Sequence, residues 1–529
     1  MSFEHRAGLL RPHSGHTVSL AELFVVDPSA AATRVSGIAS DSRLVAPGDL
    51  YVALPGLSRH GAEFVPQALA AGAVAVLTDP SGREAIGDPG VPVVVVSDPR
   101  QALGELAARI YGRPAQALAM FAVTGTNGKT TTTFLLDAAL RAAGHRVGIV
   151  GTIVYLLNGR PLESVRTTVP TPESTVLHGL LGYLHDSGAD SVVMEVSSHA
   201  LVLGRADAIT FDVAAFTNFG RDHLDFHGDE ESYFRAKASL FTRERTRHAV
   251  VNSDDPRGQQ LIAAIRAAGE VGLTTISLAD PAADYSASWV RTEADGRTRV
   301  GARLPGRRLE FTLSLPGDFN VSNALTALAM LDAAGVDLNA AAQGLATARV
   351  PGRMQRVELG STAPLVYVDF AHTPQAVTAA LAAIGGRRRI AVLGCGGDRD
   401  SAKRRPMGAA AARGADVVIV TDDNPRSEDP AAIRAEVMAG ALAAQAAATL
   451  PVTVIDGGGR RSAIHEALAL ARPGDAVAIL GKGHELGQEI GDRLLPFDDA
   501  AVVAEEWADL HAPRPPARSG AGNGAGAGR

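Results

Sequence analysis

The sequence predicts an α/β protein built from three domains. Its 529 residues exceed what a single hydrophobic core usually supports, and the length corresponds to about three or four domains. Short apolar stretches of strand length alternate with helix-like stretches along most of the chain, which is typical of parallel sheets covered by helices. A glycine-rich loop at residues 123–133 joins one such strand to one such helix.

The first predicted domain is a small α/β domain at residues 37–114, which follows an N-terminal extension at residues 1–36. The turn-forming residues Gly112, Arg113 and Pro114 mark its end. Its period and composition predict strands at Leu50–Leu54, Val74–Thr78 and Val93–Val96, and helices at Ala62–Ala71 and Pro99–Tyr111.

The central predicted domain covers residues 115–350 and contains a parallel nucleotide-binding sheet. A strand from Met120 leads into the glycine-rich loop, and a helix over Lys129–Ala143 is stopped by Gly144. Further strands are expected at Arg146–Val150, Asp190–Val196, Asp212–Thr217 and Ala249–Asn252.

The third predicted domain, at residues 351–512, is a second doubly wound, Rossmann-like sheet. The tail at residues 513–529 has no bulky apolar side chain, so we expect it to be disordered. Strands are expected at Leu365–Phe370, Ile390–Cys395, Val417–Thr421, Val452–Asp456 and Ala476–Leu480.

Composition excludes several classes of partner. The net charge of −7 and the pI near 6.1 give no general attraction to nucleic acid or anionic lipid. Apolar runs stay far below the about 18 residues that a membrane span needs. Cys395 is the single cysteine and charged residues interrupt the N-terminus, so we expect a cytoplasmic protein without disulfides.

The glycine-rich loop predicts a site for a nucleoside triphosphate. Gly125 and Gly128 let backbone N–H groups approach phosphate oxygens, and the following helix adds a partial positive charge. Lys129 supplies a cation and Thr130 a hydroxyl suited to magnesium. The alternative is a simple Gly-Asn turn between a strand and a helix.

Acidic and imidazole groups follow two other predicted strands. Glu195 ends an apolar strand, at the edge where ligands gather in open α/β sheets, and is a candidate magnesium ligand. The segment 217–228 combines histidines, including His223, with aspartates and an arginine, a set that can hold a hard cation beside a phosphate. An ordinary strand end and a solvated polar loop are the alternatives.

With these motifs in place, the chain resembles the Mur ligases over roughly residues 37–500, and within them the members that add the third amino acid of the peptidoglycan peptide. The motifs occur in the order found in the family. They are Asp41–Arg43, Pro47–Leu50, Gly125–Thr131, Glu195–Leu201, Arg221–Asp225, Asn320 with Asn323, Pro351–Arg353, Asp369–Pro374, Gly394–Lys403, Asp423–Arg426 and Gly481–Glu485.

This resemblance implies an ATP-dependent amide ligase. Such enzymes convert a glutamate carboxylate into an acyl phosphate that an amine then attacks, with Lys129, Glu195, His223 and Lys237 as the implied catalytic residues. Magnesium is implied at Thr130, Glu195, His223 and Lys237, the last as a lysine carbamylated by carbon dioxide. Sequence alone would place Lys237 on an exposed helix surface.

The resemblance also implies the nucleotide contacts. Asn320 and Asn323 are expected at the adenine, Arg353 near the phosphates and Asp369 near the ribose. Each could instead be a helix cap or a turn residue. The loop contacts are Gly125, Thr126, Asn127, Gly128, Lys129, Thr130 and Thr131.

For the uridine-nucleotide substrate, the resemblance implies a first domain that binds the uridine part through Ser42. Contacts to the sugar-dipeptide part are implied at Thr167, Thr168, Ser197, Arg205 and Lys237. The family commonly has Thr-Thr-Pro-Glu where this chain has the longer Thr-Thr-Val-Pro-Thr-Pro-Glu. The threonines that contact the substrate are therefore left open.

The amine is implied to be diaminopimelate. Asp423, Asn424, Pro425 and Arg426 match the signature of members that use diaminopimelate, whose distal carboxylate suits a guanidinium, whereas lysine ends in a bare ammonium. An Asn-Pro turn before a helix is the alternative, and both can hold together. Further contacts are implied at Arg399, Gly481 and Glu485.

Other functions compete with this interpretation. Folylpolyglutamate synthetase also joins an amine to glutamate, but its loop usually has Gly-Ser after the lysine, where this chain has Thr130. Lysine-adding and dipeptide-adding relatives are closer rivals, and Arg426 counts against the first. A nucleotide-driven switch that ligates nothing would leave His223 and Lys237 without a role. We expect a monomer that neither binds nucleic acid nor enters a membrane.

Overall fold

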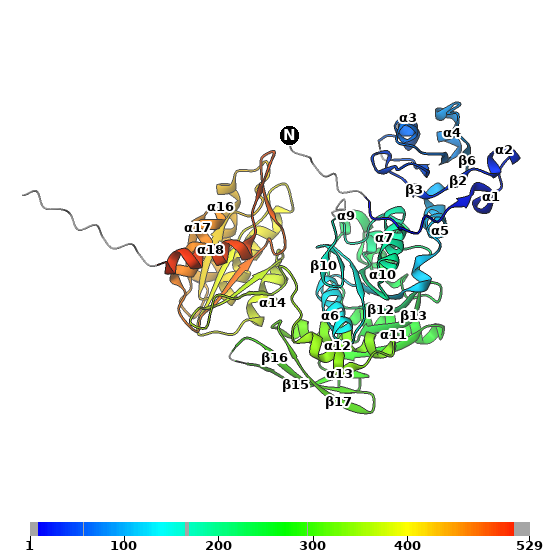
Figure 1. Cartoon of the computed structure of the whole chain (residues 1–529). Coiled ribbons are helices and arrows are strands. Elements are labelled where there is room, and N and C mark those ends of the chain that lie inside the picture. Colours follow the sequence, from blue (N-terminus) through cyan, green and yellow to red (C-terminus); the bar gives the residue numbers. More distant parts are fainter. Residues whose placement is uncertain (1–8, 57, 164–168, 294, 513–529) are drawn as a thin grey trace, which may run out of the picture. The chain divides into compact units, whose positions relative to one another are not determined.

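The computed structural model describes residues 9–56, 58–163, 169–293 and 295–512. It confirms the α/β fold class and divides into two compact units, Met1–Val350 and Pro351–Arg529. In Figure 1 the first unit runs from blue to green and the second from yellow to red. The tail at residues 513–529, predicted to be disordered, lies outside the described residues. None of the described helices combines the length and apolar character that crossing a bilayer requires.

The N-terminal part of the first unit is a parallel sheet of four strands in the order β3-β4-β5-β6. Its strands are β3 (Gly37–Ala39), β4 (Asp49–Ala53), β5 (Ala75–Thr78) and β6 (Val93–Val95). Its helices are η1 (Ser42–Leu44), η2 (Gly61–Phe64), α3 (Val65–Ala70), α4 (Pro80–Ile86) and α5 (Pro99–Ile110). Proline at the start of α4 and α5, after a capping aspartate, fits the first helical turn.

Residues 9–36, predicted as an extension, contain short elements that pack on this sheet. Val18, Leu20 and Val35 are buried in the same core cluster as Leu50 and Leu106. Because these apolar residues share a core with the sheet, this segment is structurally part of the small domain. The elements are β1 (Val18–Ser19), α1 (Leu20–Leu23), α2 (Pro28–Ala31) and β2 (Arg34–Val35).

The central sheet of the first unit has eleven strands in the order β10-β9-β8-β11-β7-β12-β13-β14-β15-β16-β17. Its middle is parallel, and β7, β8, β11 and β12 there are mostly apolar and buried, as expected for strands covered on both faces. Those strands are β7 (Ala119–Thr124), β8 (Val147–Val150), β11 (Ser191–Glu195), β12 (Phe211–Phe216), β13 (Thr246–Asn252) and β14 (Gly272–Ser277).

Strands with antiparallel pairings extend this sheet at both ends, β15 being parallel to β14 and antiparallel to β16. The sequence reasoning did not anticipate them. They alternate buried and exposed positions in part, so they lack the continuous apolar run of the middle strands. They are β9 (Tyr155–Leu157), β10 (Arg160–Pro161), β15 (Tyr285–Thr292), β16 (Thr298–Leu304) and β17 (Arg307–Leu313).

Helices complete the first unit, and α6 packs against α12 and α13 (Figure 1). The helices are η3 (Pro114–Ala117), α6 (Lys129–Ala142), α7 (Ser174–Asp186), α8 (Ser198–Val202), α9 (Leu224–His227), α10 (Glu230–Ala238), α11 (Pro256–Ala268), α12 (Asp318–Ala333) and α13 (Leu338–Leu345).

The second unit contains a six-stranded sheet in the order β18-β19-β23-β20-β21-β22, parallel except for β18. Its strands are β18 (Gln355–Val357), β19 (Leu365–Asp369), β20 (Arg389–Leu393), β21 (Val417–Thr421), β22 (Thr453–Gly458) and β23 (Ala476–Leu480), with a separate hairpin of β24 (Gly487–Ile490) and β25 (Arg493–Pro496). Its helices are α14 (Pro374–Ala383), η4 (Ser401–Lys403), α15 (Arg404–Gly414), α16 (Pro430–Ala446), α17 (Arg460–Leu470) and α18 (Asp499–His511).

Candidate functional site

The glycine-rich loop joins the end of β7 to the start of α6. Gly125 has φ +146°, and a Cβ there would lie 2.0 Å from Thr217 Oγ1. Gly128 has φ +86°, and a Cβ there would lie 2.5 Å from Asn323 Oδ1. Only glycine adopts these angles in so little space. The loop therefore presents backbone, not side chains, to the edge of the sheet.

Lys129 is the first residue of α6, and its side chain folds back over the loop. The Nζ atom donates to the carbonyl oxygens of Gly125 and Thr126, each at 2.9 Å. Lys237 Nζ donates to the same Gly125 carbonyl at 2.8 Å. Two lysine amines thus meet one backbone oxygen beside the loop.

Glu195 ends β11, which pairs with β7, so its carboxylate reaches the same edge as the loop. Thr130 Oγ1 donates to Glu195 Oε1 at 3.0 Å, and Thr152 donates to both carboxylate oxygens through its N–H and hydroxyl. The glutamate is only 1% exposed. Sequence reasoning missed Thr152, although its place two residues after the end of β8 is similar to the strand-end signal that singled out Glu195.

Lys237 is buried, which corrects the sequence expectation of an exposed helix residue. Its exposed fraction is 1%, and its amine reaches the Gly125 carbonyl of the glycine-rich loop. Its Nζ lies 4.4 Å from the centre of the Tyr233 ring. Burial, and then the positive charge of Lys129, lower the pKa of Lys237 well below its ordinary value.

His223 lies at the start of α9 with φ +52° and is half exposed. Its ring contacts His199 edge-on at 4.8 Å and lies 6.1 Å from the ring of Tyr233, measured between ring centres. Tyr233 and Lys237 are one turn apart on α10. Among the described residues, no group of three or more histidine, cysteine, aspartate or glutamate side chains is placed to hold a metal.

The four residues predicted to hold magnesium are therefore only partly gathered. Thr130 and Glu195 are in contact, and both offer the oxygen ligands that magnesium prefers. Lys237 lies beside the loop as a buried amine whose charged form is disfavoured, which suits conversion to a carboxylate-like group. Thr130, Glu195 and Lys237 therefore fit the magnesium ion that the sequence implies. His223 belongs to the adjoining aromatic cluster.

Asn320 and Asn323 lie in the first two turns of α12 and are buried. Asn320 Nδ2 donates to the Pro316 carbonyl at 2.7 Å, and Asn323 Nδ2 donates to Asn320 Oδ1 at 3.3 Å. Asn323 also packs on Gly128. Neither asparagine caps the helix, because the cap position is Gly317.

The remaining predicted residues of the first unit are spread over three elements. Ser42 opens η1 and donates to Gln67 Oε1 at 2.9 Å, whereas Ser197 caps α8. Arg205 Nε donates to Glu173 Oε1 at 2.8 Å. Thr167 and Thr168 lie outside the described residues. Thr171, from the same segment, donates to the Glu195 carbonyl at 2.7 Å.

The second unit gathers the predicted amino-acid-binding residues at the carboxyl edge of its sheet. Asp423 and Asn424 follow β21, and Gly481 follows β23 with φ +113°. A Cβ on Gly481 would lie 2.7 Å from Asp423 Oδ2. Burial raises the pKa of Asp423, against the opposing effect of nearby cations. Asn424 Nδ2 donates to Glu485 Oε2 at 2.9 Å.

Two arginines flank Gly396 at this edge. Arg426 has φ +51°, donates from Nη1 to the Gly397 carbonyl at 2.8 Å, and pairs with Glu489 at 2.5 Å. A Cβ on Gly396 would lie 3.0 Å from Arg426 Nη1 and 4.0 Å from Arg399 Cγ. Two cationic side chains beside a glycine can attract an anionic group. The turn expected at Pro425 is also present, since Glu428 N donates to the Pro425 carbonyl at 3.1 Å.

Asp369 and Arg353 lie elsewhere on the same edge. Asp369 ends β19, and its Oδ2 accepts from Met354 N at 2.7 Å. Burial raises the pKa of Asp369, and the Arg353 charge opposes that shift. Arg353 itself stacks over Phe370, with 4.5 Å between the guanidinium carbon and the ring centre.

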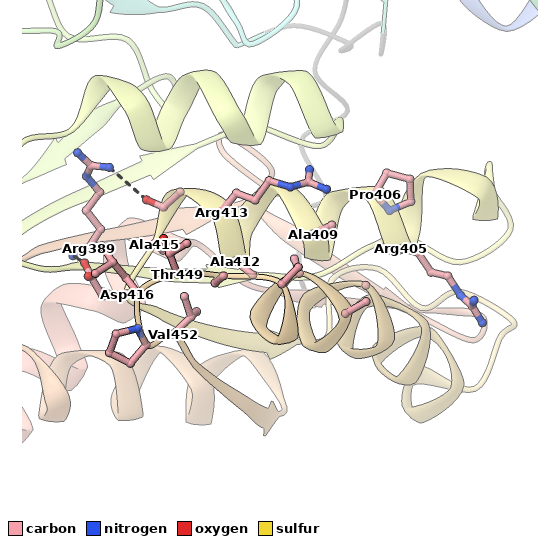
Figure 2. Close-up of a pocket in the computed structure, with 18 of the residues that line it drawn as sticks. Arg389, Arg405, Pro406, Ala409, Ala412, Arg413, Ala415, Asp416, Thr449 and Val452 are labelled. Carbon is pink, nitrogen blue, oxygen red and sulfur yellow. Dashed lines mark hydrogen bonds between the residues drawn. The ribbon is translucent and has the colours of Figure 1, made fainter.

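A cleft of about 830 Å³ in the second unit is separate from these residues (Figure 2). It runs along α15 and α16, and alanine is its most frequent lining residue. Arg389, Arg405 and Arg413 also line it. The helices approach closely, because a Cβ on Gly440 would lie 2.0 Å from the Arg405 carbonyl oxygen. None of the predicted site residues lines this cleft.

Family models match three consecutive parts of the chain. They are described as Mur ligase family, catalytic domain, at residues 34–111, Mur ligase middle domain, at residues 123–331, and Mur ligase, glutamate ligase domain, at residues 352–483. The chain belongs to the Mur ligase family. The resemblance drawn from the sequence motifs is thereby confirmed.

Similar Mur ligases are matched over nearly their whole length. A protein of Streptomyces avermitilis named "UDP-N-acetylmuramoyl-L-alanyl-D-glutamate--2,6-diaminopimelate ligase" is 46% identical, over 94% of this chain and 97% of its own. A protein of the same name from Corynebacterium glutamicum is 44% identical, over 89% of this chain and 91% of its own.

Solved structures agree with this. A structure titled with the same ligase name has a TM-score of 0.69 at 32% identity and covers 94% of this chain and all 100% of its own. A folylpolyglutamate synthase from Mycobacterium tuberculosis, complexed with ADP, has a TM-score of 0.58 at 21% identity, covering 73% of this chain and 92% of its own. At that identity it shares the fold alone.

Proposed function

We propose that this Mur ligase joins diaminopimelate to UDP-N-acetylmuramoyl-L-alanyl-D-glutamate at the expense of ATP. The full-length similarity to proteins of that name supports the substrates. The observation that carries the proposal is the contact of Thr130 with Glu195 beside the phosphate loop. A hydroxyl and a carboxylate at a helix N-terminus are what a magnesium nucleotide requires.

The loop residues bind and orient the triphosphate. On binding, the Lys129 ammonium would donate to phosphate oxygens instead of the two carbonyls that it now contacts. The phosphate oxygens would then lie beside a full positive charge. Magnesium would be held by Thr130 and Glu195, with a carbamylated Lys237 as a further oxygen ligand. When bound, magnesium screens the repulsion between the ATP phosphates and the substrate carboxylate.

The reaction then proceeds in two steps. A carboxylate oxygen of the substrate glutamate attacks the γ-phosphorus, and ADP leaves with the electron pair of the broken phosphorus–oxygen bond. The neutral amine of diaminopimelate attacks the acyl carbon, inorganic phosphate leaves, and the nitrogen loses a proton as the amide forms. Catalysis rests on positioning and on charge screening, because both reactants of the first step are anions.

Residues of the second unit supply the amine specificity. Arg426 and Arg399 flank Gly396 and suit the distal carboxylate, because a guanidinium pairs with a carboxylate through two hydrogen bonds. Glu485 suits the distal ammonium. Lysine lacks this carboxylate and would offer the two guanidinium groups no substrate anion.

Product analysis tests the proposal directly. The purified protein would be offered ATP, magnesium, the uridine-linked dipeptide and either diaminopimelate or lysine, and the product identified by its mass. We expect one amide-linked product with diaminopimelate and none with lysine. A product with lysine alone would contradict the proposed amine.

The same assay separates a ligase from a nucleotide-driven switch. A ligase releases phosphate only when the amine is present, whereas a switch releases it without amine. The cytoplasmic location and the monomeric state expected from the sequence remain predictions.

A further inference from the structure

Lys482 is a buried cation to which the reaction above assigns no role. It follows Gly481 at the end of β23 and is 0% exposed. Lysine is rarely buried to this degree unless its charge is paired. The partners of its ammonium group therefore indicate what it does.

Three partners of this ammonium group belong to the proposed diaminopimelate site. Lys482 Nζ donates to Asn424 Oδ1 at 2.9 Å and to Glu485 Oε2 at 3.2 Å. Asp423 Oδ1 lies at 3.8 Å. One ammonium group thus contacts three residues of the predicted set.

Lys482 fixes which way the Asn424 amide points. A lysine ammonium has three donors and no acceptor, so the atom facing it must be the amide oxygen. Glu489 N also donates to this oxygen at 3.0 Å. The amide nitrogen is therefore turned toward Glu485 Oε2, at 2.9 Å.

Both donors meet the same oxygen of Glu485. Oε2 accepts from Lys482 and from Asn424, and the described part of the chain offers no hydrogen-bond donor to Oε1. The glutamate side chain is 36% exposed. One carboxylate oxygen is held by the protein, and the other is left to accept from a substrate.

We propose that Lys482 is a positioning residue for amine recognition, which orients Asn424 and Glu485 so that Glu485 Oε1 faces the distal ammonium of diaminopimelate. This inference rests on the proposed function. Lys482 acts through Glu485 and touches no reacting atom. The rival is a merely structural role, in which Lys482 only neutralises the buried Asp423.

A double-mutant cycle between Lys482 and Glu485 separates the two roles. The full chain would carry Lys482→Met, Glu485→Gln or both, and KM for diaminopimelate, KM for ATP and kcat would be measured. We expect Lys482→Met to raise KM for diaminopimelate about tenfold, the usual effect of disturbing a buried hydrogen-bonded charge, with KM for ATP unchanged. The double variant should be no worse than Glu485→Gln, because Glu485→Gln already removes the carboxylate that Lys482 is proposed to orient.

Arg388→Met is the matched control. Arg388 pairs with the buried Asp475 at 3.1 Å. Asp475 directly precedes β23, and Lys482 follows the opposite end of that strand. Arg388→Met also removes the cationic partner of a buried carboxylate, that of Asp475, next to the same sheet. It should leave KM for diaminopimelate unchanged. The double variant leaves one uncompensated carboxylate fewer than Lys482→Met does. If Lys482→Met does not fold, KM for diaminopimelate is therefore compared between Glu485→Gln and the double variant, and equal values support the positioning role.

Additive losses in the cycle, or equal effects of Lys482→Met on both KM values, would overturn the positioning role. Failure of the proposed function has a different signature. In that case the unmodified protein would form no product from diaminopimelate, and the inference would fall with it.

Discussion

Lys237 is the residue whose environment differs most from its sequence pattern. Its neighbours on the helix include charged residues, yet it is buried beside a second lysine. Burial lowers its pKa in the folded state below the unfolded value. The unfolded chain therefore binds more protons between the two values, and the cost to stability grows as pH falls below the unfolded pKa.

Replacing Lys237 by methionine should remove this pH-dependent cost. In buffer free of carbon dioxide, the variant should gain more unfolding free energy relative to the parent at pH 7 than at pH 10. At pH 10 the unfolded lysine is close to its own pKa of about 10.4, so most of the pH-dependent cost is already gone. Denaturant unfolding at the two pH values measures the difference. An equal difference at both pH values would show that Lys237 is not held neutral.

Arg426 offers a residue-level test of the amine. Arg426→Ala should weaken transition-state binding of diaminopimelate by ~2–5 kcal/mol, because the distal carboxylate of the bound substrate would lose its guanidinium partner. The measurement is kcat/KM for diaminopimelate, with KM for ATP as the internal control. Unchanged kcat/KM would remove Arg426 from the site.

Strand ends could be predicted from the sequence because they combine an apolar run with a polar residue. The expected strands at Val417–Thr421 and Ala476–Leu480 coincide with β21 and β23, and the expected helix at Lys129–Ala143 ends one residue beyond α6. Contacts between distant segments could not be predicted. The hydrogen bonds from Thr152 to Glu195 depend on the pairing of β8 with β11. No local sequence pattern predicts that pairing.

At the scale of elements, the close approach of α15 and α16 depends on glycine. A Cβ on Gly440 would lie 2.0 Å from the Arg405 carbonyl oxygen, so Gly440→Ala should destabilise the second unit by about 1–3 kcal/mol through overpacking. Gly385→Ala is the control, since nothing lies within 4 Å of its Cβ position. Equal thermal unfolding midpoints for the two variants would contradict this packing account.

At the scale of the whole molecule, the proposed chemistry is divided between two units. Thr130 and Glu195, the residues proposed to handle phosphate, lie in the first unit. Arg426 and Glu485, the residues proposed to recognise the amine, lie in the second. The sequence motifs lead to this proposal because each motif follows a strand of its own sheet. The sequence did not predict the burial of Lys482, because a lysine between two glycines is typical of an exposed turn.

The central claim is that the substrate carboxylate is phosphorylated before the amine attacks it. Its most direct test labels that carboxylate with heavy oxygen and follows the label through one complete turnover. We predict that one labelled oxygen appears in the released inorganic phosphate, and only when diaminopimelate is present. Phosphate released without the label, while the amide product still forms, would contradict the account.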